Sequence, residues 1–314
     1  MTTARQLKPA ERIYRGGRTT PGRWATWEPR VGDILVCTPP KSGTTWTQSI
    51  LTMLVNGGPD LPGKVPELSP WVDADLGVSA EEVRAALNRQ TGRRVVKTHT
   101  PADGFPVWEG VTVVAVYRHP LDVFFSLRKH LANMRDLPAD DPGLAPVAQS
   151  LALFRDADTN IEDFDRDCIA SIVLHHNKTA LSGRLPDVKV FHYADMIRDG
   201  RRAVEQLALA AGIEADDALI DRVAEATSFG AMKANAENFA PVAGTGFWKT
   251  DAGFFDSATS RKWEGQLSDE DLAHYEARMT ELIPDVRSKR WLENGLEHSK
   301  ALDGGAGGRK SSAL

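Results

Sequence analysis

The chain has 314 residues, 41% of them hydrophobic and 26% charged, and its net charge at pH 7 is -5. Such a chain can bury a substantial core as one large domain, and its acidic balance argues against a general affinity for nucleic acid without excluding a local basic pocket. The polar, basic N-terminal stretch lacks the apolar core of a signal peptide, and no apolar run is long enough to cross a bilayer. We therefore expect a cytoplasmic protein with no membrane span.

Residues 1–30 contain Gly16-Gly17, Pro21-Gly22 and Pro29, which predict an arm that packs on the domain instead of folding as a separate unit. The domain itself is expected over residues 31–296. Residues 297–314 combine Gly, Lys and Ser with little apolar content, which is typical of a disordered tail.

Residues 33–46 predict a strand, a tight loop and the start of a helix. The apolar run 34–37 is typical of a buried strand, and Pro39-Pro40 cannot continue a ladder. From Trp46 onward, apolar residues recur at three- and four-residue steps, as they do on the buried face of a helix.

The loop in this stretch has the features of an anion site. A helix N-terminus presents unpaired N–H groups, Gly43 allows close approach of the backbone, and Lys41 adds a positive charge. Hydroxyls of Ser42, Thr44 and Thr45 can donate to anionic oxygens, so we expect a phosphate or phosphosulfate ligand. The alternative is an ordinary strand-to-helix turn with a capping Ser or Thr.

The P-loop of nucleotide triphosphatases has two glycines four residues apart before Lys-Ser/Thr, and here the first glycine is missing. The segment from Pro40 to Trp46 instead resembles the 5′-phosphosulfate loop of the cytosolic-type sulfotransferases, whose pattern is close to Pro-Lys-Ser-Gly-Thr-Thr-Trp. The match is unbroken. The resemblance implies that the donor-binding residues of this loop are Lys41, Ser42, Gly43, Thr44, Thr45 and Trp46.

Residues 56–76 contain several prolines and glycines and predict a long loop. Leu68, Trp71 and Val72 make this loop a candidate wall of an acceptor pocket, and a surface loop pinned by one buried Trp is the alternative. Ser79 is then expected to cap a short helix that ends near Asn88.

Residues 94–99 predict a second strand that ends in polar residues. Ligands collect at the carboxyl ends of strands in open α/β sheets, and Lys97 and His99 lie on one face of an extended segment. Lys97-Thr98-His99 resembles a Lys-Thr-His segment of the same family, whose histidine is the catalytic base. The resemblance implies His99 as the base, with Lys97 steadying the sulfuryl oxygens and Lys41 stabilising charge on the leaving phosphate. A lone surface histidine is the alternative.

Residues 111–117 predict a buried parallel strand, and Pro120 is well placed as the first residue of the helix that follows. Arg118 and Ser126 resemble the family's 3′-phosphate pair, with the spacing Arg-x-Pro-x-Asp-x-x-x-Ser. A guanidinium that forks onto phosphate oxygens distinguishes a 3′-phosphorylated nucleotide from an ordinary one. The alternative is that Arg118 is a surface charge at the start of a helix and that Ser126 is a helix residue with no role in binding.

Residues 135–167 are rich in Asp and are expected to mix loop and helix over the acceptor site. A charge run of this kind usually forms a solvated face; if it lines the pocket, it disfavours highly anionic acceptors. Cys37 and Cys168 have neither disulfide-framework nor zinc-site spacing, and we interpret His175 and His176 as packing or pocket residues. We expect no metal.

Residues 188–193 predict a fourth strand that leads into a helix reaching Gly212. Segments here resemble the family's Phe-x-Tyr-Glu-Asp-Met and Thr-Ser-Phe-x-x-Met patterns. The resemblance implies that Tyr193 contacts the adenine ring and that Thr227 and Phe229 surround the purine. Both segments would otherwise be interpreted as ordinary core.

The last family pattern, Phe-Phe-Arg-Lys-Gly-x-x-Gly-Asp-Trp, is only partly present. Asp256-Ser257-Ala258 occupies its Arg-Lys-Gly positions, and an acid near the 3′-phosphate is unfavourable. We expect Arg261 to restore the positive charge, with Lys262 as the alternative. A helix capped by Ser268 and a last short element complete the domain.

The sequence therefore predicts a single α/β domain, with helices on both faces of a mostly parallel sheet and a P-loop-like phosphosulfate loop. The resemblance implies a sulfotransferase that uses 3′-phosphoadenosine 5′-phosphosulfate to modify a hydroxyl of a small-molecule or lipid acceptor, with an amine as the alternative acceptor group. Two alternatives stay open: a P-loop-type kinase or nucleotide hydrolase, and a catalytically silent nucleotide-binding protein. The acceptor and the oligomeric state are not encoded in any pattern found, and a homodimer is one candidate.

Overall fold

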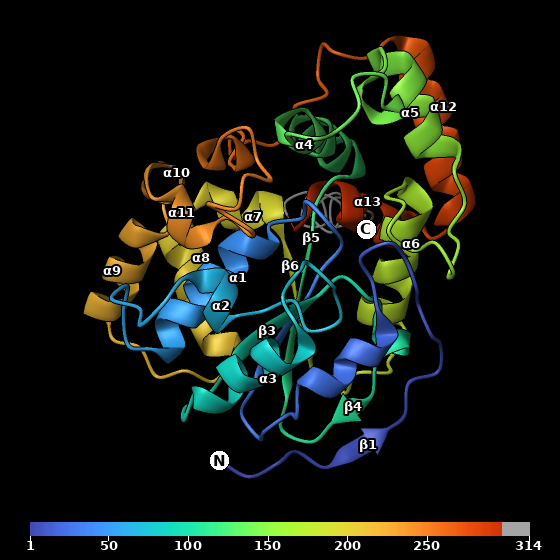
Figure 1. The fold of residues 1–314 in the computed structure, drawn as a ribbon. Coiled ribbons are helices and arrows are strands. Elements are labelled where there is room, and N and C mark those ends of the chain that lie inside the picture. Colours follow the sequence, from blue (N-terminus) through green and yellow to red (C-terminus); the bar gives the residue numbers. More distant parts are fainter. Residues whose placement is uncertain (297–314) are drawn as a thin grey trace, which may run out of the picture.

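The computed structural model describes residues 1–296, and Figure 1 shows its central sheet surrounded by helices. The sheet has four parallel strands in the order β3-β2-β5-β6. Their bounds are β2 Ile34–Cys37, β3 Val95–Thr98, β5 Thr112–Tyr117 and β6 Val188–His192. All four predicted strands are present and every pair is parallel, so the predicted fold class is confirmed.

Alternate residues of β2 pack on opposite faces of the sheet, as the two-residue period of a strand requires. Ile34 and Val36 belong to one core cluster, while Leu35 and Cys37 belong to another. All four side chains are fully buried. Helices therefore cover both faces, which explains why the strand is continuously apolar.

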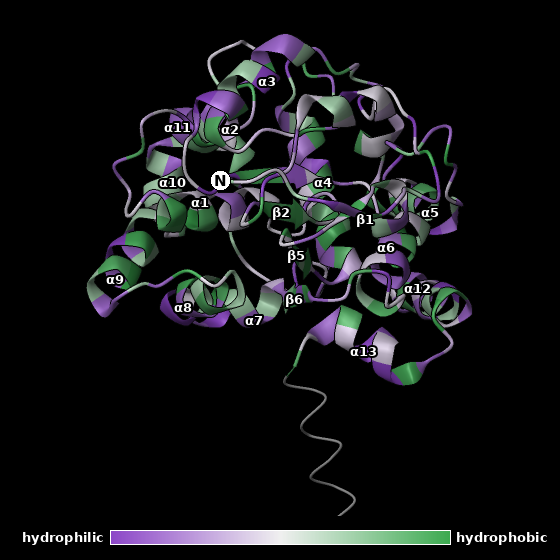
Figure 2. Ribbon diagram, turned by 90° about the horizontal axis from the view of Figure 1, so that it is seen from below, coloured by the Kyte–Doolittle hydropathy of each residue, from purple (hydrophilic) through white to green (hydrophobic). Residues whose placement is uncertain are grey.

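The face with Ile34 and Val36 packs against helices on the left side of Figure 1. These helices are α1 Thr44–Val55, α7 Tyr193–Arg198, α8 Gly200–Ala210 and α9 Asp217–Ala226, followed by α10 Phe229–Ala234 and α11 Ala236–Phe239. Seen from below, the strands form an apolar centre and the outer helix faces are polar (Figure 2).

The other face packs at its β5 side against a second group of helices. They are α4 Pro120–Asn133, α5 Val147–Asp156, α6 Ile169–His176, α12 Asp269–Leu282 and α13 Val286–Asn294. The rest of that face is covered by α3 Ala80–Arg89 and by the segment around Phe105. Short turns of 3-10 helix lie at Pro21–Thr26, Ala102–Gly104, Pro142–Leu144 and Asp251–Phe254.

Helix starts follow the local signals in the sequence. Ser79 and Ser268 each accept a hydrogen bond from the third residue of their helix and form capping boxes, and Pro120 is the first residue of α4. Gly43 is the N-cap of α1 in a left-handed conformation, with φ of 98°. These predicted starts are confirmed.

One predicted helix is shorter than expected. The helix after β6 is divided at Asp199, which is extended and accepts a hydrogen bond from the backbone N–H of Arg202, so it caps α8 instead of continuing α7. The helix that begins at Ile169 remains α-helical to His176 and then widens into a π-helical turn, Asn177–Leu181.

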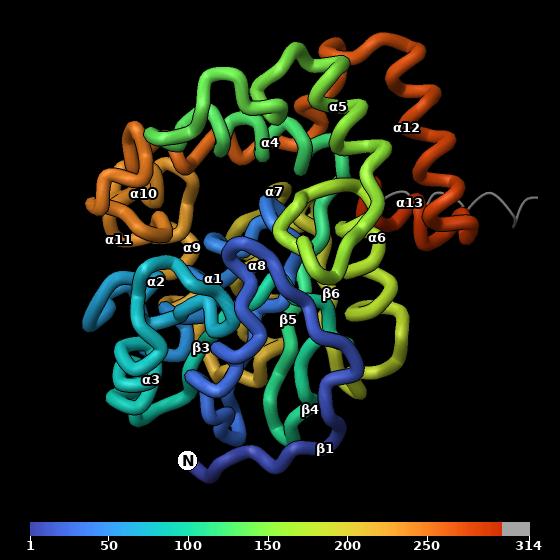
Figure 3. The backbone as a smooth tube through the Cα atoms, turned by 45° about the vertical axis from the view of Figure 1, so that its right-hand side comes forward, coloured from blue at the N-terminus to red at the C-terminus, as the bar shows by residue number. Residues whose placement is uncertain are grey.

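The N-terminal arm is held at several points along the domain. Strand β1, Gln6–Lys8, pairs antiparallel with β4, Val107–Trp108, and Thr19 forms a bridge with Ala74. Figure 3 shows the blue arm continuing past the sheet toward the segment before α6. There the backbone of Arg15 exchanges hydrogen bonds with Ile161 and Phe164, both of 2.7 Å.

The loop over residues 56–76 contains one helical turn, α2 Val65–Leu68, and no long element, as predicted. After that turn Trp71 forms a parallel bridge with Lys97, so this segment runs beside the end of β3. No helix within residues 1–296 is long and apolar enough to cross a membrane. The predicted disordered tail lies outside the described residues.

Candidate active site

A cavity of about 1270 Å³ opens where the four strands of the sheet end. The carboxyl end of each strand contributes to its wall, as expected for an open α/β sheet. The predicted site residues that line the cavity are Lys41, Gly43, Thr44, Thr45, Trp46, Lys97, His99, Arg118, Ser126, Tyr193, Thr227, Phe229 and Lys262. Two predicted residues, Ser42 and Arg261, are not part of the wall.

The loop between β2 and α1 is shaped by two residues with positive φ, Lys41 at 60° and Gly43 at 98°. A side chain at Gly43 would clash, because its Cβ would lie 2.7 Å from Cδ2 of Tyr193. Glycine thus lets the loop close against the end of β6. The first turn of α1, Thr44 to Trp46, lines the cavity, and the N–H groups of a first helical turn have no partner within the helix.

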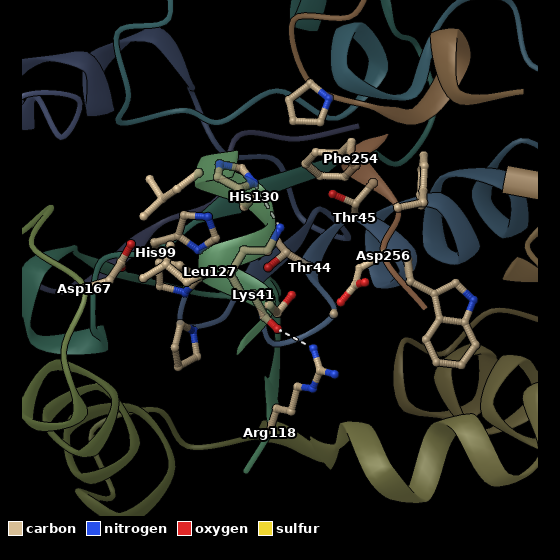
Figure 4. Close-up of a pocket in the computed structure, with 18 of the residues that line it drawn as sticks. Lys41, Thr44, Thr45, His99, Arg118, Leu127, His130, Asp167, Phe254 and Asp256 are labelled. Carbon is tan, nitrogen blue, oxygen red and sulfur yellow. Dashed lines mark hydrogen bonds between the residues drawn. The ribbon is translucent and has the colours of Figure 1, made fainter. Parts of the chain in front are cut away.

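The hydroxyls of the loop are used differently from one another. Ser42 is fully buried and donates to the carbonyl of Pro40 at 3.5 Å, so its hydroxyl is turned into the protein. Thr44 exchanges a hydrogen bond of 2.6 Å with Thr38, which joins the helix start to the end of β2. Thr45 lies in the cavity wall and is displayed in Figure 4.

Arg118, directly after β5, ties several segments together. Its guanidinium donates to the carbonyl of Lys41 at 3.2 Å and to that of Thr259 at 2.7 Å, and it lies 4.5 Å from the ring centre of Tyr193. The residue is only 4% exposed, and its Nε has no acceptor among the described residues. A buried donor without a partner on a cavity-lining cation is a feature that an anionic ligand would satisfy.

His99 follows β3 and is oriented by a backbone carbonyl. Its Nδ1 lies 2.7 Å from the carbonyl oxygen of Thr38, and because a carbonyl only accepts, Nδ1 carries the proton. Nε2 therefore keeps a free lone pair. Burial, followed by the charge of Lys97, holds the pKa of His99 well below its ordinary value, so the imidazole is neutral.

A buried carboxylate, Asp73, supports the strand end that carries His99. Its Oδ2 accepts hydrogen bonds from the hydroxyls of Thr98 at 2.8 Å and Thr100 at 2.6 Å, the residues on either side of His99. Burial raises the pKa of Asp73 to about 6. No sequence motif marks Asp73, which lies in the loop over residues 56–76.

Trp71, from the same loop, packs against both polar residues of the β3 end. Its ring centre is 4.5 Å from that of His99 and 4.7 Å from Nζ of Lys97. Burial lowers the pKa of Lys97 to about 8, and the nearby Asp73 acts in the opposite direction. Trp71 lines the cavity as predicted, whereas Leu68 and Val72 do not.

Lys41 reaches across the cavity to α4. Its Nζ is 3.0 Å from Nδ1 of His130 and 4.7 Å from the ring centre of Phe254 (Figure 4). Burial, followed by the charges of Arg118, Lys262 and Lys97, lowers the pKa of Lys41 to about 7. His130 belongs to no motif in the sequence; its position one helical turn after Ser126 places both residues on one face of α4.

The loop after Phe255 brings Lys262, and not Arg261, to the cavity. Lys262 forms an ion pair with Asp256, so the acid that replaces the family arginine is neutralised within the loop. The Arg261 side chain is 61% exposed and pairs with Glu264 at 3.4 Å. The backbone N–H groups of both basic residues donate to Asp122 at 2.9 and 2.7 Å, which fixes the loop on the start of α4.

The part of the cavity beyond Lys41 and His99 has largely apolar walls. Its apolar residues come from α4, α5 and the segments before α6 and after α11, and include Leu127, Leu131, Met134, Leu153, Phe154, Phe164, Phe247 and Trp248. From the Asp-rich stretch, Asp141, Asp165 and Asp167 line the cavity. The N-terminal arm contributes Arg18. We call this part the acceptor half and the part around Arg118 and Tyr193 the donor half, after the roles that we propose for them below.

His175 also lines the cavity, while His176 is buried and stacks on Trp291 with ring centres 5.5 Å apart. Both histidines are thus pocket or packing residues, as interpreted. Among residues 1–296, no group of three or more His, Cys, Asp or Glu side chains is arranged to hold a metal ion.

Comparison with known proteins identifies the family. The model of the sulfotransferase domain matches residues 31–287. A glycolipid sulfotransferase of Mycobacterium tuberculosis strain H37Ra is 32% identical over 299 residues, covering 87% of this chain and 91% of that protein. Sulfotransferase 1E1 of Bos taurus is 30% identical over 217 residues, covering 67% of this chain and 68% of that protein.

A solved structure shares the fold. Mouse sulfotransferase SULT7A1 complexed with PAP covers 89% of this chain and 92% of its own length, with a TM-score of 0.65 and 19% identity. At that identity the likeness concerns the fold alone. The family assignment depends on the domain match and on the mycobacterial relative, and together they show that the chain belongs to the sulfotransferase family.

Proposed function

We propose that this protein transfers a sulfuryl group from 3′-phosphoadenosine 5′-phosphosulfate to a hydroxyl group of an apolar small molecule or lipid. The observation that carries the proposal is that the Lys41 loop, Arg118 and His99 open on one cavity with an apolar far half. Relatives named as glycolipid sulfotransferases support a lipid acceptor. A cytoplasmic location, which cell fractionation would test, completes the proposal.

The donor half suits a nucleotide with phosphate at both ends of its ribose. In this proposal the loop from Lys41 to Trp46 and the first turn of α1 hold the 5′-phosphosulfate, because backbone N–H groups, the Thr45 hydroxyl and a cation are available there. Arg118 and Ser126 hold the 3′-phosphate, with Lys262 as a further cation. Tyr193, Thr227 and Phe229 enclose the adenine.

The transfer step uses His99 and Lys41. The acceptor hydroxyl attacks sulfur in line as its proton passes to Nε2 of His99, whose Nδ1 proton is held by the Thr38 carbonyl. The bond between sulfur and the 5′-phosphate oxygen breaks, and protonated Lys41 stabilises the charge that develops on that oxygen. Lys97 steadies the sulfuryl oxygens. The products are the sulfate ester and 3′-phosphoadenosine 5′-phosphate.

Replacing His99 by Asn tests the assignment of the base. Asn has a similar size and keeps a hydrogen-bonding group but cannot take the proton, so single-turnover transfer should slow by about 10² to 10⁴. Binding of 3′,5′-adenosine bisphosphate, measured by calorimetry, should stay near wild type. His274→Asn is the matched control, since His274 is exposed on α12. Wild-type transfer by His99→Asn would exclude His99 as the base, with His175 next to test.

Two other functions give different results in a nucleotide panel. A P-loop-type kinase or hydrolase would be stabilised most by ATP with Mg²⁺, whereas we expect the bisphosphate nucleotide without metal to stabilise this protein most. At a ligand concentration a hundred times its dissociation constant, the bound nucleotide should raise the free energy of unfolding by about 2.7 kcal/mol. A catalytically silent binding protein would show that stabilisation but no transfer to any hydroxyl acceptor.

A further inference from the structure

The contact between Lys41 and His130 lies at the boundary between the donor and acceptor halves. Nζ of Lys41 is 3.0 Å from Nδ1 of His130, and Figure 4 shows the lysine side chain rising from its loop toward the imidazole, on the side where His99 also lies. His130 belongs to α4, and neighbours on the same helix, Leu127 and Leu131, line the acceptor half. The contact therefore spans from the phosphosulfate loop to the acceptor wall.

The imidazole of His130 is held by aromatic rings. Trp248 lies 4.8 Å and Phe254 5.9 Å from it between ring centres, both edge-on. Burial, and next the charge of Lys41, keep the pKa of His130 far below its ordinary value. A neutral imidazole has one nitrogen that accepts, and since an ammonium only donates, Nδ1 is the acceptor in this contact.

Lys41 needs such a partner because its surroundings are mostly cationic. Five charged or titratable groups surround its ammonium. Arg118 follows β5, Lys97 lies in β3, and Lys262 belongs to the loop after Phe255. Asp167 precedes α6, and His130 lies on α4. Three are cations and only Asp167 is a carboxylate. Without a nearby acceptor, the ammonium would lose its proton at a still lower pH.

We propose that His130 is a positioning residue for Lys41: its Nδ1 accepts a hydrogen bond that fixes the ammonium at the boundary of the two halves and favours its protonated form. The proposal builds on the function proposed above, in which protonated Lys41 stabilises the leaving phosphate. It assigns to α4 a contribution to the donor loop that no motif in the chain indicates.

The test compares two substitutions of His130. His130→Phe keeps a ring between Trp248 and Phe254 but removes the acceptor, whereas His130→Asn places an amide oxygen near the position of Nδ1. For His130→Phe the alkaline limb of the kcat/KM profile should move about one unit lower, which gives about a tenfold loss at pH 8 and little loss at pH 6. His130→Asn should restore most of the activity at pH 8. A uniform loss at all pH values would overturn the proposal.

A double-mutant cycle with Lys41→Met separates positioning from packing. If His130 acts through Lys41, His130→Phe should cost nothing further once Lys41 is Met. An equal fold-loss in both backgrounds would instead show a packing role and contradict the proposal. His274→Phe, on the exposed face of α12, is the control for a general effect of replacing a histidine.

A readout without turnover distinguishes this proposal from the proposed function. Competitive acetylation at a series of pH values, followed by mass spectrometry of the peptide that contains Lys41, reports the pKa of its amine. His130→Phe should lower that value by about one unit while that of Lys97 stays unchanged. This result would support the role of His130 even if no acceptor were sulfated, and an unchanged Lys41 value would refute it.

Discussion

At the scale of single residues, Arg118 should determine which nucleotide is bound. Arg118→Lys keeps a charge but cannot fork onto two phosphate oxygens as a guanidinium does. We expect binding of 3′,5′-adenosine bisphosphate to weaken by about 1.5 to 3 kcal/mol and binding of adenosine 5′-phosphate to change little. Calorimetry with both nucleotides checks this. An equal loss for both would assign Arg118 a general electrostatic role.

The site residues that could be predicted from the sequence are those that lie in short motifs of consecutive residues. Lys41, Arg118 and His99 each sit in a short motif directly after a strand, and the sheet topology brings those ends together. His130 and Asp73 could not be found in this way, because their partners are distant in the sequence. His130 contacts Lys41, 89 residues away, and Asp73 accepts hydrogen bonds from Thr98 and Thr100, 25 and 27 residues away. Contacts of this kind depend on how loops and helices pack, which no local period encodes.

At the scale of elements, the loop over residues 256–262 should act through Lys262 and not Arg261. Lys262→Met should weaken binding of the bisphosphate nucleotide, because it removes a cation from the cavity and leaves Asp256 unpaired beside the proposed phosphate site. Asp256→Asn should tighten binding by releasing Lys262 toward the ligand.

Arg261→Met is the matched control in this loop, and its exposed side chain predicts a dissociation constant close to wild type. Calorimetric titration of the three variants at low and moderate salt measures these effects. A larger loss for Arg261→Met than for Lys262→Met would reverse the assignment and return the role to Arg261.

Helices and strands could be predicted wherever a clear local signal marks their first residues. The capping serines and Pro120 mark helix starts in the sequence, and continuous apolar runs mark the buried strands. The division at Asp199 was missed because apolar spacing continues on both sides of it, whereas the capping bond to Arg202 appears only in the folded chain. The approach of the loop over residues 56–76 to β3 was also missed, since a bridge between Trp71 and Lys97 has no local pattern.

At the scale of the whole molecule, buried histidines should make the fold sensitive to mild acid. Burial lowers the pKa of each of the six histidines His99, His119, His130, His175, His176 and His192. The unfolded chain binds a proton at each below about pH 6.5, whereas the folded chain does not, so falling pH favours unfolding. Each contributes a slope of up to about 1.4 kcal/mol per pH unit.

Three buried carboxyl groups act in the opposite direction. Burial raises the pKa of Asp73 and of Asp167 to about 6 and also raises the pKa of Glu293, so the folded state takes up these protons first and gains stability as pH falls toward 4. The six histidines outnumber these three carboxyl groups, so the net effect of mild acid is a loss of stability. Urea unfolding should therefore have a lower midpoint at pH 5.5 than at pH 7.5, and an equal or higher midpoint at pH 5.5 would contradict the prediction. His176→Phe should flatten the dependence, since it removes one titrating group while keeping a ring on Trp291.

The N-terminal arm affects where this chain can be truncated and which segment can be exchanged with a relative. The match to the sulfotransferase domain begins at residue 31, yet Arg18 lines the catalytic cavity, and Asp165 accepts hydrogen bonds from the backbone and hydroxyl of Thr19 at 2.9 and 2.7 Å. A fragment trimmed to the matched boundary would keep every motif residue and still lack a part of the cavity wall. A segment exchanged between relatives to transfer acceptor preference should therefore begin before residue 31 and include Arg18 and Thr19.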